Sequence, residues 1–234
     1  MDYKETWFIT GASTGLGLHL AKGLLQNGHR VAAIARDKEA LRSLGGGLTM
    51  VADEGAGTGW REGHLLCLTA DLTNEDSVQA AIQRTIGQFG RIDNVVNYGG
   101  YDLPGSIEAL SGCEIHQYFE ENVFGTFYVL KQVIPYLCDQ RSGTILNFSS
   151  AAVAAAVTGS TLYAATKLAI ESLSEELTAD IEDLGIQQTF IGPAASLQKG
   201  DATLSQNGEE GVFFRNAYGH VNREQAFQRA ALLV

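Results

Sequence analysis

Short segments rich in β-branched and aromatic residues alternate along this chain with longer segments of helical periodicity. The first is "TWFIT" at residues 6–10, and residues 15–27 after it have the apolar spacing of a helix. A second pair follows, with "RVAAIA" at 30–35 and a helical stretch at 37–44. Strands that alternate with helices in this way form parallel sheets joined by right-handed helical crossovers. The alternation therefore predicts an α/β fold.

The same alternation continues over most of the chain. Further strands are predicted at 64–70, 92–97, 143–149 and 186–192, and further helices at 74–88, about 112–137 and about 160–184. Together these elements predict a Rossmann-like, doubly wound parallel sheet of about six to seven strands with helices on both faces. The 234 residues, 45% of them hydrophobic, suffice for one sizeable core, so we expect a single domain at 1–234.

Three segments depart from this rhythm. Residues 44–63 are rich in glycine and lack apolar periodicity, so we interpret them as a surface insertion. Residues 196–221 include a similar turn-rich stretch, and we expect them to form a mobile lid over the substrate. Residues 222–234 have the apolar spacing of a last amphipathic helix.

The charge and the cysteines of the chain disfavour several classes of partner. The net charge is -11, with 16 basic and 27 acidic residues spread along the chain, so a nucleic acid or an anionic membrane would be repelled. No apolar run reaches the roughly 18 residues that span a bilayer, and the N-terminus lacks a secretion signal, so we expect a soluble, cytoplasmic protein. Cys67, Cys113 and Cys138 are far apart and have no ligand-spaced partners, which predicts reduced, structural cysteines and no bound metal.

A glycine-rich segment, "TGASTGLG" at residues 10–17, stands between the first predicted strand and its helix. Gly11, Gly15 and Gly17 follow the pattern T-G-x-x-x-G-x-G. Such a turn lets the backbone approach a pyrophosphate, and the next helix offers that anion unpaired N–H groups and the positive end of its dipole. Glycine turns also occur for packing reasons alone, but the position after the first strand of an alternating fold favours a dinucleotide site.

Arg36 lies at the end of the second predicted strand, where an acidic residue would hold the hydroxyls of an adenosine ribose. A guanidinium at this position can pair with a 2'-phosphate instead, which predicts NADP(H) as the cofactor. The alternative is a solvated arginine at a helix start, beside Asp37 as a capping residue.

Five ordered motifs make the chain resemble the short-chain dehydrogenase/reductase family, in its NADP(H)-preferring form. They are "TGASTGLG", "ADLT" at 70–73, Asn122 in the long helix, "NFSS" at 147–150 and "YAATK" at 163–167. The resemblance implies a set of cofactor contacts beyond the three glycines and Arg36. These are Ser13, Thr14 and Leu16 in the glycine turn, Asp71 and Leu72 at the adenine, Asn97 on the nicotinamide side, Tyr163, Lys167 and Pro193.

The resemblance also implies a catalytic set. Ser150 lies 13 residues before Tyr163, and Tyr163 and Lys167 stand at i and i+4 on one helix face. In this interpretation Tyr163 is the acid or base, Lys167 lowers its pKa and holds the ribose, and Ser150 positions the substrate oxygen. Asn122 supports the proton relay through a water. Without these companions, a tyrosine and a lysine at this spacing would be read as two exposed polar residues.

Two motifs depart from the family pattern. "NYGG" at 97–100 places Tyr98 where the family has an asparagine, and "GPAA" at 192–195 places Ala194 where it has a glycine. These departures leave two alternatives open. The chain could be a non-redox enzyme on the same scaffold, such as a cyclase, dehydratase or epimerase, or a dinucleotide-sensing binding protein.

The preferred interpretation is an oxidoreductase that transfers a hydride between NADP(H) and a small-molecule carbonyl or alcohol. The small apolar residues at 149–157 favour a mainly apolar ketone or aldehyde. In the family the two long helices, near 112–137 and 160–184, pair across a two-fold axis, which implies a homodimer or homotetramer. A buried helix would show the same composition.

Overall fold

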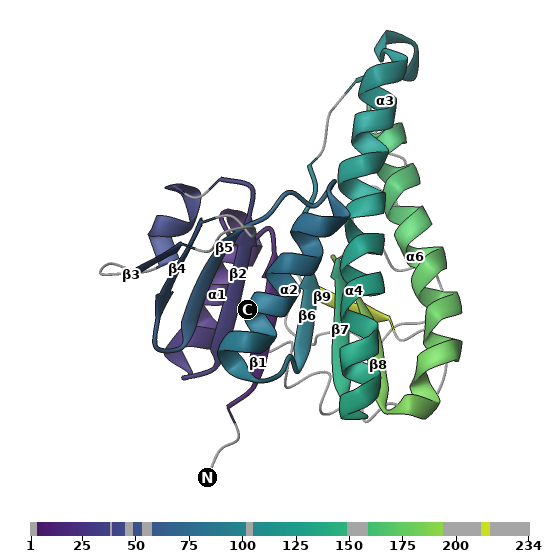
Figure 1. Ribbon diagram of the computed structural model, residues 1–234. Helices are drawn as coiled ribbons and strands as arrows, with labels where there is room; N and C mark the ends of the chain where they lie inside the picture. Colours follow the sequence, from purple (N-terminus) through teal and green to yellow (C-terminus); the bar gives the residue numbers. More distant parts are fainter. Residues whose placement is uncertain are drawn as a thin grey trace.

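One sheet runs through the computed structural model, which describes residues 4–37, 39–44, 49–52, 58–101, 105–148, 159–193 and 212–215. Its strands are β1 (Thr6–Thr10), β2 (Arg30–Ala35), β3 (Thr49–Ala52), β4 (Thr58–Glu62), β5 (Leu65–Thr69), β6 (Asn94–Asn97), β7 (Gly143–Phe148), β8 (Ile186–Pro193) and β9 (Val212–Arg215). The spatial order of the nine strands is β3-β4-β5-β2-β1-β6-β7-β8-β9 (Figure 1).

The six central strands, from β5 to β8, are parallel, which confirms the predicted Rossmann-like sheet. All five residues of β1 are buried, as expected for a strand covered by helices on both faces. β1 pairs with β2 on one side and with β6 on the other, so the strand order reverses at β1. Open α/β sheets bind their ligands at the carboxyl ends of the strands beside such a reversal.

Three antiparallel strands extend this sheet at its edges. β3 and β4 form a hairpin that pairs with β5, and they lie within residues 44–63, for which the sequence predicted only a surface insertion. β9 pairs with β8 at the opposite edge, inside the segment expected to form a lid. These short segments lie in or beside turn-rich stretches that do not alternate with predicted helices, so the pattern that reveals the central strands is absent there. The helix predicted at 222–234 lies outside the described residues.

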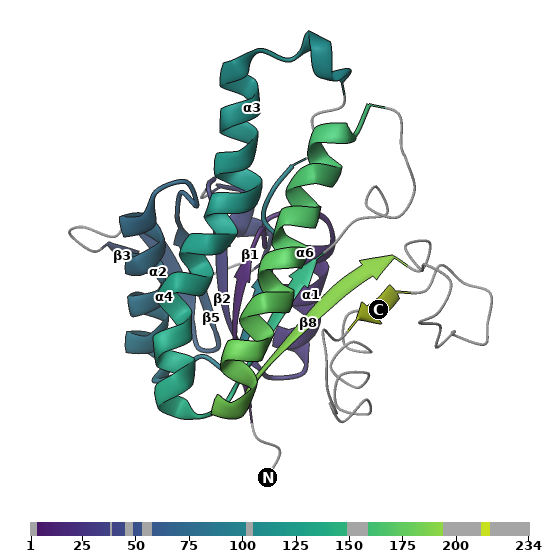
Figure 2. The same ribbon diagram turned by 90° about the vertical axis from the view of Figure 1, so that its right-hand side faces the viewer.

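Helices and helical turns cover both faces of the sheet (Figure 2). They are α1 (Gly15–Gln26), η1 (Glu39–Leu44), α2 (Glu75–Phe89), η2 (Ile107–Ala109), α3 (Gly112–Phe119), η3 (Glu120–Phe124), α4 (Gly125–Gln140), α6 (Thr161–Ile181) and η4 (Glu182–Leu184). α1 and η1 pack on one face, and α2, α4 and α6 contribute to the apolar cluster on the other. Among the described helices, none has the length and apolar character that a membrane span requires.

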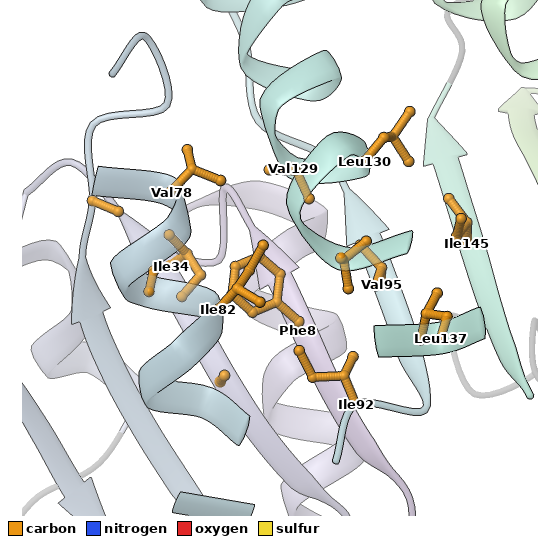
Figure 3. Packing of buried hydrophobic residues seen from close by; sticks show 14 of the residues in the cluster. Phe8, Ile34, Val78, Ile82, Ile92, Val95, Val129, Leu130, Leu137 and Ile145 are labelled. Carbon is orange, nitrogen blue, oxygen red and sulfur yellow. The ribbon is translucent and has the colours of Figure 1, made fainter. Parts of the chain in front are cut away.

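The apolar cluster under α2 and α4 is shown in Figure 3. Phe8, Ile82 and Val95 are fully buried in it and come from β1, α2 and β6. Asn74 is the N-cap of α2, and its Oδ1 accepts a hydrogen bond of 3.1 Å from the backbone N–H of Ser77. The cap and the buried apolar face fix α2 against the middle of the sheet.

The long helix predicted at about 112–137 is present, but it contains a π-helical turn. α3 begins with a capping box between Ser111 and Glu114, and it leads through η3 into α4. η3 is a π-helix of five residues with Asn122 at its centre. π turns within α-helices often occur at functional sites, because the extra residue shifts the side chains and carbonyls of the turn. The interruption lies at the position that the sequence assigns to the proton relay.

Replacing Ile82 with alanine tests the core described above. Ile82 is fully buried, so its truncation should lower the free energy of unfolding by about 2–5 kcal/mol through lost burial and a cavity. Ile107 is 57% exposed, and its replacement with alanine should change the stability by no more than about 0.5 kcal/mol. Urea denaturation of both variants measures the two values. Equal effects of the two substitutions would contradict this core.

Candidate active site

The glycine-rich turn connects the carboxyl end of β1 to α1 at the point where the strand order reverses. Gly11 has φ 68°, and a Cβ added to it would lie 3.0 Å from the backbone nitrogen of Gly99. A Cβ on Gly17 would collide with the carbonyl oxygen of Gly11. Gly15 has φ 52°, and its added Cβ would meet only the hydroxyl of Tyr98, at 3.5 Å. Gly11 and Gly17 therefore permit close packing of the backbone. Gly15 has a positive φ, which favours glycine, and open space around its Cα.

The N-terminus of α1 has free hydrogen-bonding capacity. Thr14 is its N-cap with extended backbone, φ -143° and ψ 164°, and its side chain makes no capping hydrogen bond. Asn74 and Ser111 do cap α2 and α3 with their side chains. The first N–H groups of α1 thus remain available to an anion, and the glycine turn beside them lets it approach the backbone. The residues present fit the pyrophosphate of a dinucleotide.

The remaining turn residues have different surroundings. Ser13 is half-buried in the turn, and Leu16 packs against the apolar cluster under α1. Leu16 therefore anchors the start of α1, and Ser13 and Thr14 supply the polar atoms of the turn.

Thr10 joins the turn to the end of β6. Its hydroxyl accepts hydrogen bonds from the backbone N–H groups of Tyr98 and Gly99, at 3.2 and 3.1 Å, and it donates to the carbonyl of Val96 at 3.2 Å. The ring of Tyr98 is half-buried and packs edge-on against Phe148, with 5.1 Å between ring centroids. Tyr98, which replaces the family's asparagine, is therefore accommodated by packing beneath the glycine turn.

Asn97 begins a buried chain of polar side chains. Its Nδ2 donates to Oδ1 of Asn147 at 2.8 Å, and Nδ2 of Asn147 donates to the hydroxyl of Ser174 at 2.9 Å. Ser174 lies on α6 and donates to the carbonyl of Ile170 at 2.7 Å. Asn97 stands at the carboxyl end of β6, as predicted, and it bonds to Asn147, whose amide group ties the sheet to the helix that carries Tyr163.

Arg36, predicted to bind a 2'-phosphate, forms an ion pair with Glu121. Its guanidinium lies 2.7 Å from Oε2 of Glu121, and the two side chains are 61% and 11% exposed. The hydrogen bond to Glu121 raises the pKa of Arg36. Glu121 could not be identified from the sequence, because its partner lies 85 positions earlier in the chain and only the fold brings the two together.

Asp71 and Leu72, predicted to contact the adenine, follow the carboxyl end of β5. β5 is parallel to β2, whose carboxyl end precedes Arg36. Oδ1 of Asp71 accepts hydrogen bonds from the backbone N–H and the hydroxyl of Thr73, at 3.0 and 2.8 Å. Leu72 fits between two glycines, since a Cβ added to Gly99 or Gly125 would lie 2.8 or 3.0 Å from its side chain. Leu72 thus touches both the end of β6 and the start of α4.

Asn122 is buried in the π turn and holds the segment that follows β6. Its Oδ1 accepts from the backbone N–H of Tyr101 at 3.0 Å, and its Nδ2 lies 3.2 and 3.1 Å from the carbonyl oxygens of Tyr101 and Tyr118. Gly100 is required here, because any Cβ on it would collide with Oδ1 of Asn122. The side chain of Asn122 therefore fixes backbone positions, and the predicted proton relay through Asn122 stays a prediction.

Tyr163 and Lys167 lie one turn apart on α6, as predicted. Lys167 is 7% exposed, and its Nζ lies 5.4 Å from the centroid of the Tyr163 ring. Burial lowers the pKa of Lys167 to about 8, because the charged ammonium loses its hydration. No ion pair among the described residues includes Lys167. The helix thus holds a poorly solvated cation beside a phenol.

The apolar contacts of α6 place this pair near Asn122. Ile170, on α6, packs with Val123, the neighbour of Asn122, and with Phe190 of β8. Ser150, predicted to position the substrate oxygen, lies outside the described residues. Pro193 is the last residue of β8 and is opposite Val212 of β9 in the strand register.

The described residues give no indication of a metal centre. They contain no cluster of three or more His, Cys, Asp or Glu side chains that could hold an ion. Cys67, Cys113 and Cys138 are all free, and burial raises the pKa of the Cys67 thiol to about 12. Cys67 is therefore an inert core residue at neutral pH, in agreement with its predicted structural role.

Comparison with known proteins identifies the family. A family model described as short chain dehydrogenase matches residues 5–208, and the chain belongs to this family. The oxidoreductase calM of Penicillium decumbens is 37% identical over an alignment of 198 residues, which covers 81% of this chain and 60% of calM. The oxidoreductase claN of Passalora fulva is 34% identical over an alignment of 201 residues, which covers 83% of each protein. The chain thus spans less than two thirds of calM but most of claN.

Solved structures show the same fold. A short-chain dehydrogenase from Streptomyces avermitilis is similar with a TM-score of 0.70 and 27% identity, over 81% of this chain and 65% of the other. A metagenomic short-chain oxidoreductase in complex with NADP has a TM-score of 0.70 and 24% identity, over 81% and 82% of the two chains. These similarities support the parallel sheet and its helices as the family's fold.

Replacing Lys167 with methionine should stabilise the unliganded protein. The pKa of about 8, against 10.5 for an unburied lysine, means that the buried charge costs up to about 3 kcal/mol. Below pH 8 the lysine is charged in the folded and unfolded states, so the full cost applies, and it disappears as the pH rises from about 8 to 10.5. The variant should therefore be more stable than the parent at pH 7, and the difference should narrow towards pH 10.

Urea denaturation at pH 7 and pH 10 measures this difference. Lys22 is exposed on α1, so Lys22→Met removes a cation that water already solvates and should show no such narrowing. A Lys167→Met variant that is less stable than the parent at both pH values would contradict the burial of a charged Lys167.

Proposed function

We propose that the protein is an NADP(H)-dependent oxidoreductase that transfers a hydride between the nicotinamide and the carbon of a carbonyl or alcohol. The observation that carries the proposal is the buried Lys167 beside Tyr163 on α6. Several relatives are named as oxidoreductases, calM and claN among them, which supports the same class of activity here. A mainly apolar ketone or aldehyde is the proposed substrate.

Tyr163 would donate its phenolic proton to the substrate oxygen during reduction and accept a proton during oxidation. A phenol with a pKa near 10 exchanges protons poorly at neutral pH, so it needs a nearby positive charge that favours the phenolate. Lys167 provides that charge at 5.4 Å from the ring, in a site where water screens it little. When bound, NADPH supplies the hydride, and the proton and the hydride together convert the carbonyl into an alcohol.

Ser150 and Asn122 complete the proposed site. Ser150 would donate a hydrogen bond to the substrate oxygen as negative charge develops there, and one such donor contributes roughly 3 kcal/mol to transition-state stabilisation. Asn122 would act with a bound water that returns protons to Lys167. Its observed hydrogen bonds to Tyr101 and Tyr118 support a rigid position for this part of the π turn.

The uncapped N-terminus of α1 and the glycine turn support dinucleotide binding, and Arg36 supports NADP(H) over NAD(H). Arg36 is the cation at the end of β2, where the adenosine ribose lies in doubly wound folds. Solved relatives bind either nucleotide: the metagenomic oxidoreductase is in complex with NADP, and a 3-ketoacyl-(acyl-carrier-protein) reductase from Brucella melitensis is in complex with NADH. The preference in this chain is therefore inferred from Arg36.

Replacing Tyr163 with phenylalanine tests the proposed chemistry. The variant should lose roughly a hundredfold or more in kcat/KM for NADPH-dependent reduction of apolar ketones and aldehydes, because the proton donor is gone. Its affinity for NADPH, measured by fluorescence titration, should stay within about twofold of the parent if only the reacting atom has been removed. Tyr136→Phe removes the same hydroxyl from a half-buried position on α4 and should leave both values unchanged.

Two outcomes would overturn the proposal. Undiminished turnover in the Tyr163→Phe variant would show that the phenol is not the acid or base. NADPH binding without turnover of any carbonyl substrate by the parent would favour a dinucleotide-sensing protein.

We also propose a homodimer or homotetramer assembled through α4 and α6, which lie side by side in Figures 1 and 2. Phe124 at the end of η3, Phe127 on α4 and Leu168 on α6 are 43%, 38% and 49% exposed. The rings of Phe124 and Phe127 lie side by side, with 6.4 Å between their centroids, and exposed apolar groups of this kind favour association.

A charge at Phe127 tests the proposed assembly. The Phe127→Glu variant should elute as a monomer in size-exclusion chromatography with light scattering, while the parent elutes as a dimer or tetramer. A monomeric parent would refute the assembly, and an oligomeric Phe127→Glu variant would refute this interface.

A further inference from the structure

The ion pair between Arg36 and Glu121 joins two elements that both border the adenosine end of the proposed cofactor site. Arg36 follows β2, and Glu121 lies in the π turn directly before Asn122. The atoms Nη2 and Oε2 are 2.7 Å apart, and the carboxylate is the more buried partner, with 11% of its side chain exposed against 61% for Arg36. The cation proposed to recognise a 2'-phosphate is thus already neutralised by a carboxylate from the protein itself.

Glu121 is held from its own helix as well. Its Oε1 accepts a hydrogen bond of 3.2 Å from Nε2 of Gln117, one turn earlier. The carboxylate is therefore held by Gln117 as well as by Arg36, and its charge lies where it would act on a ligand of Arg36.

The charges around Arg36 are mainly negative. Asp71 and Glu121 both interact electrostatically with Arg36. The ionisable Tyr101 also interacts electrostatically with Glu121 and with Arg36. With two carboxylates and one guanidinium, the group carries a formal charge of -1 when Tyr101 is neutral. A 2'-phosphate, with a charge near -2, would compete with Glu121 for Arg36 and be repelled by both carboxylates.

We infer that Glu121 is a specificity-determining residue that weakens the binding of NADP(H) relative to NAD(H) by competing with the 2'-phosphate for Arg36. This inference rests on the proposed function, in particular on Arg36 as the 2'-phosphate ligand. NAD(H) carries a ribose hydroxyl at this position, so it leaves the ion pair intact and binds without this competition. The protein should consequently accept both nucleotides, with a smaller preference for NADP(H) than Arg36 alone would give.

The test is a fluorescence titration of the full chain and its variants with NADPH and, separately, NADH. Glu121→Gln keeps the shape and one acceptor of the side chain but removes its charge. The affinity for NADPH should rise on the order of tenfold, because a charge this close is poorly screened, while the affinity for NADH should change less than about twofold. Glu120→Gln removes the same charge one position earlier, away from the ion pair, and should change neither affinity by more than about twofold.

Arg36→Ala separates the inference from the proposal on which it depends. If Arg36→Ala weakens NADPH binding and Glu121→Gln does not strengthen it, the inference about Glu121 is wrong while Arg36 stands as the phosphate ligand. If Arg36→Ala leaves NADPH binding unchanged, the 2'-phosphate site is elsewhere and both statements fail. Weaker NADH binding by the Glu121→Gln variant would also overturn the inference, because Glu121 would then hold the ribose hydroxyls itself.

Discussion

The hydroxyl of Thr10 holds together the two strands between which the strand order of the sheet reverses. It binds the backbone of β6 at Val96, Tyr98 and Gly99, and thereby sets how closely the glycine turn approaches β6. At that distance Gly11 has no room for a side chain, because its Cβ would lie 3.0 Å from the backbone nitrogen of Gly99. The ring of Tyr98 lies beside this contact and against the first turn of α1, since a Cβ added to Gly17 would lie 3.1 Å from Cδ1 of Tyr98. The proposed pyrophosphate site therefore depends on how closely the backbone packs at the carboxyl ends of β1 and β6.

The proposed catalytic site also has a cost in stability. Lys167 is buried without an ion pair among the described residues, and burial moves its pKa towards neutrality. Proteins retain such unfavourable groups where function requires them, and a poorly solvated cation exerts a stronger field on a nearby phenol than an exposed one would. A dinucleotide whose ribose hydroxyls accept hydrogen bonds from Lys167 would offset part of this cost. Cofactor binding and the charge of Lys167 are therefore coupled in this account.

The sequence was sufficient to predict the central sheet, because buried parallel strands such as β1 and β2 are continuous apolar runs. The spacing of Tyr163 and Lys167 predicted their shared helix face. β3, β4 and β9 were not predicted, since these short antiparallel strands lie in or beside turn-rich stretches that lack the alternation of strands and helices. The pairing of Arg36 with Glu121 could not be predicted either, because it depends on how the end of β2 faces the π turn. The same holds for the ring of Tyr98, whose place beneath the glycine turn follows from tertiary packing with Phe148.

The measurement that tests this account most directly is the uptake of protons when NADPH binds, obtained by titration calorimetry at pH 8 in two buffers of different ionisation enthalpy. Lys167 has a pKa of about 8 in the unliganded protein, and hydrogen bonds to the ribose should raise that pKa. The account predicts binding with uptake of up to about half a proton, which disappears in the Lys167→Met variant. Absence of binding, or equal proton uptake in that variant, would contradict it.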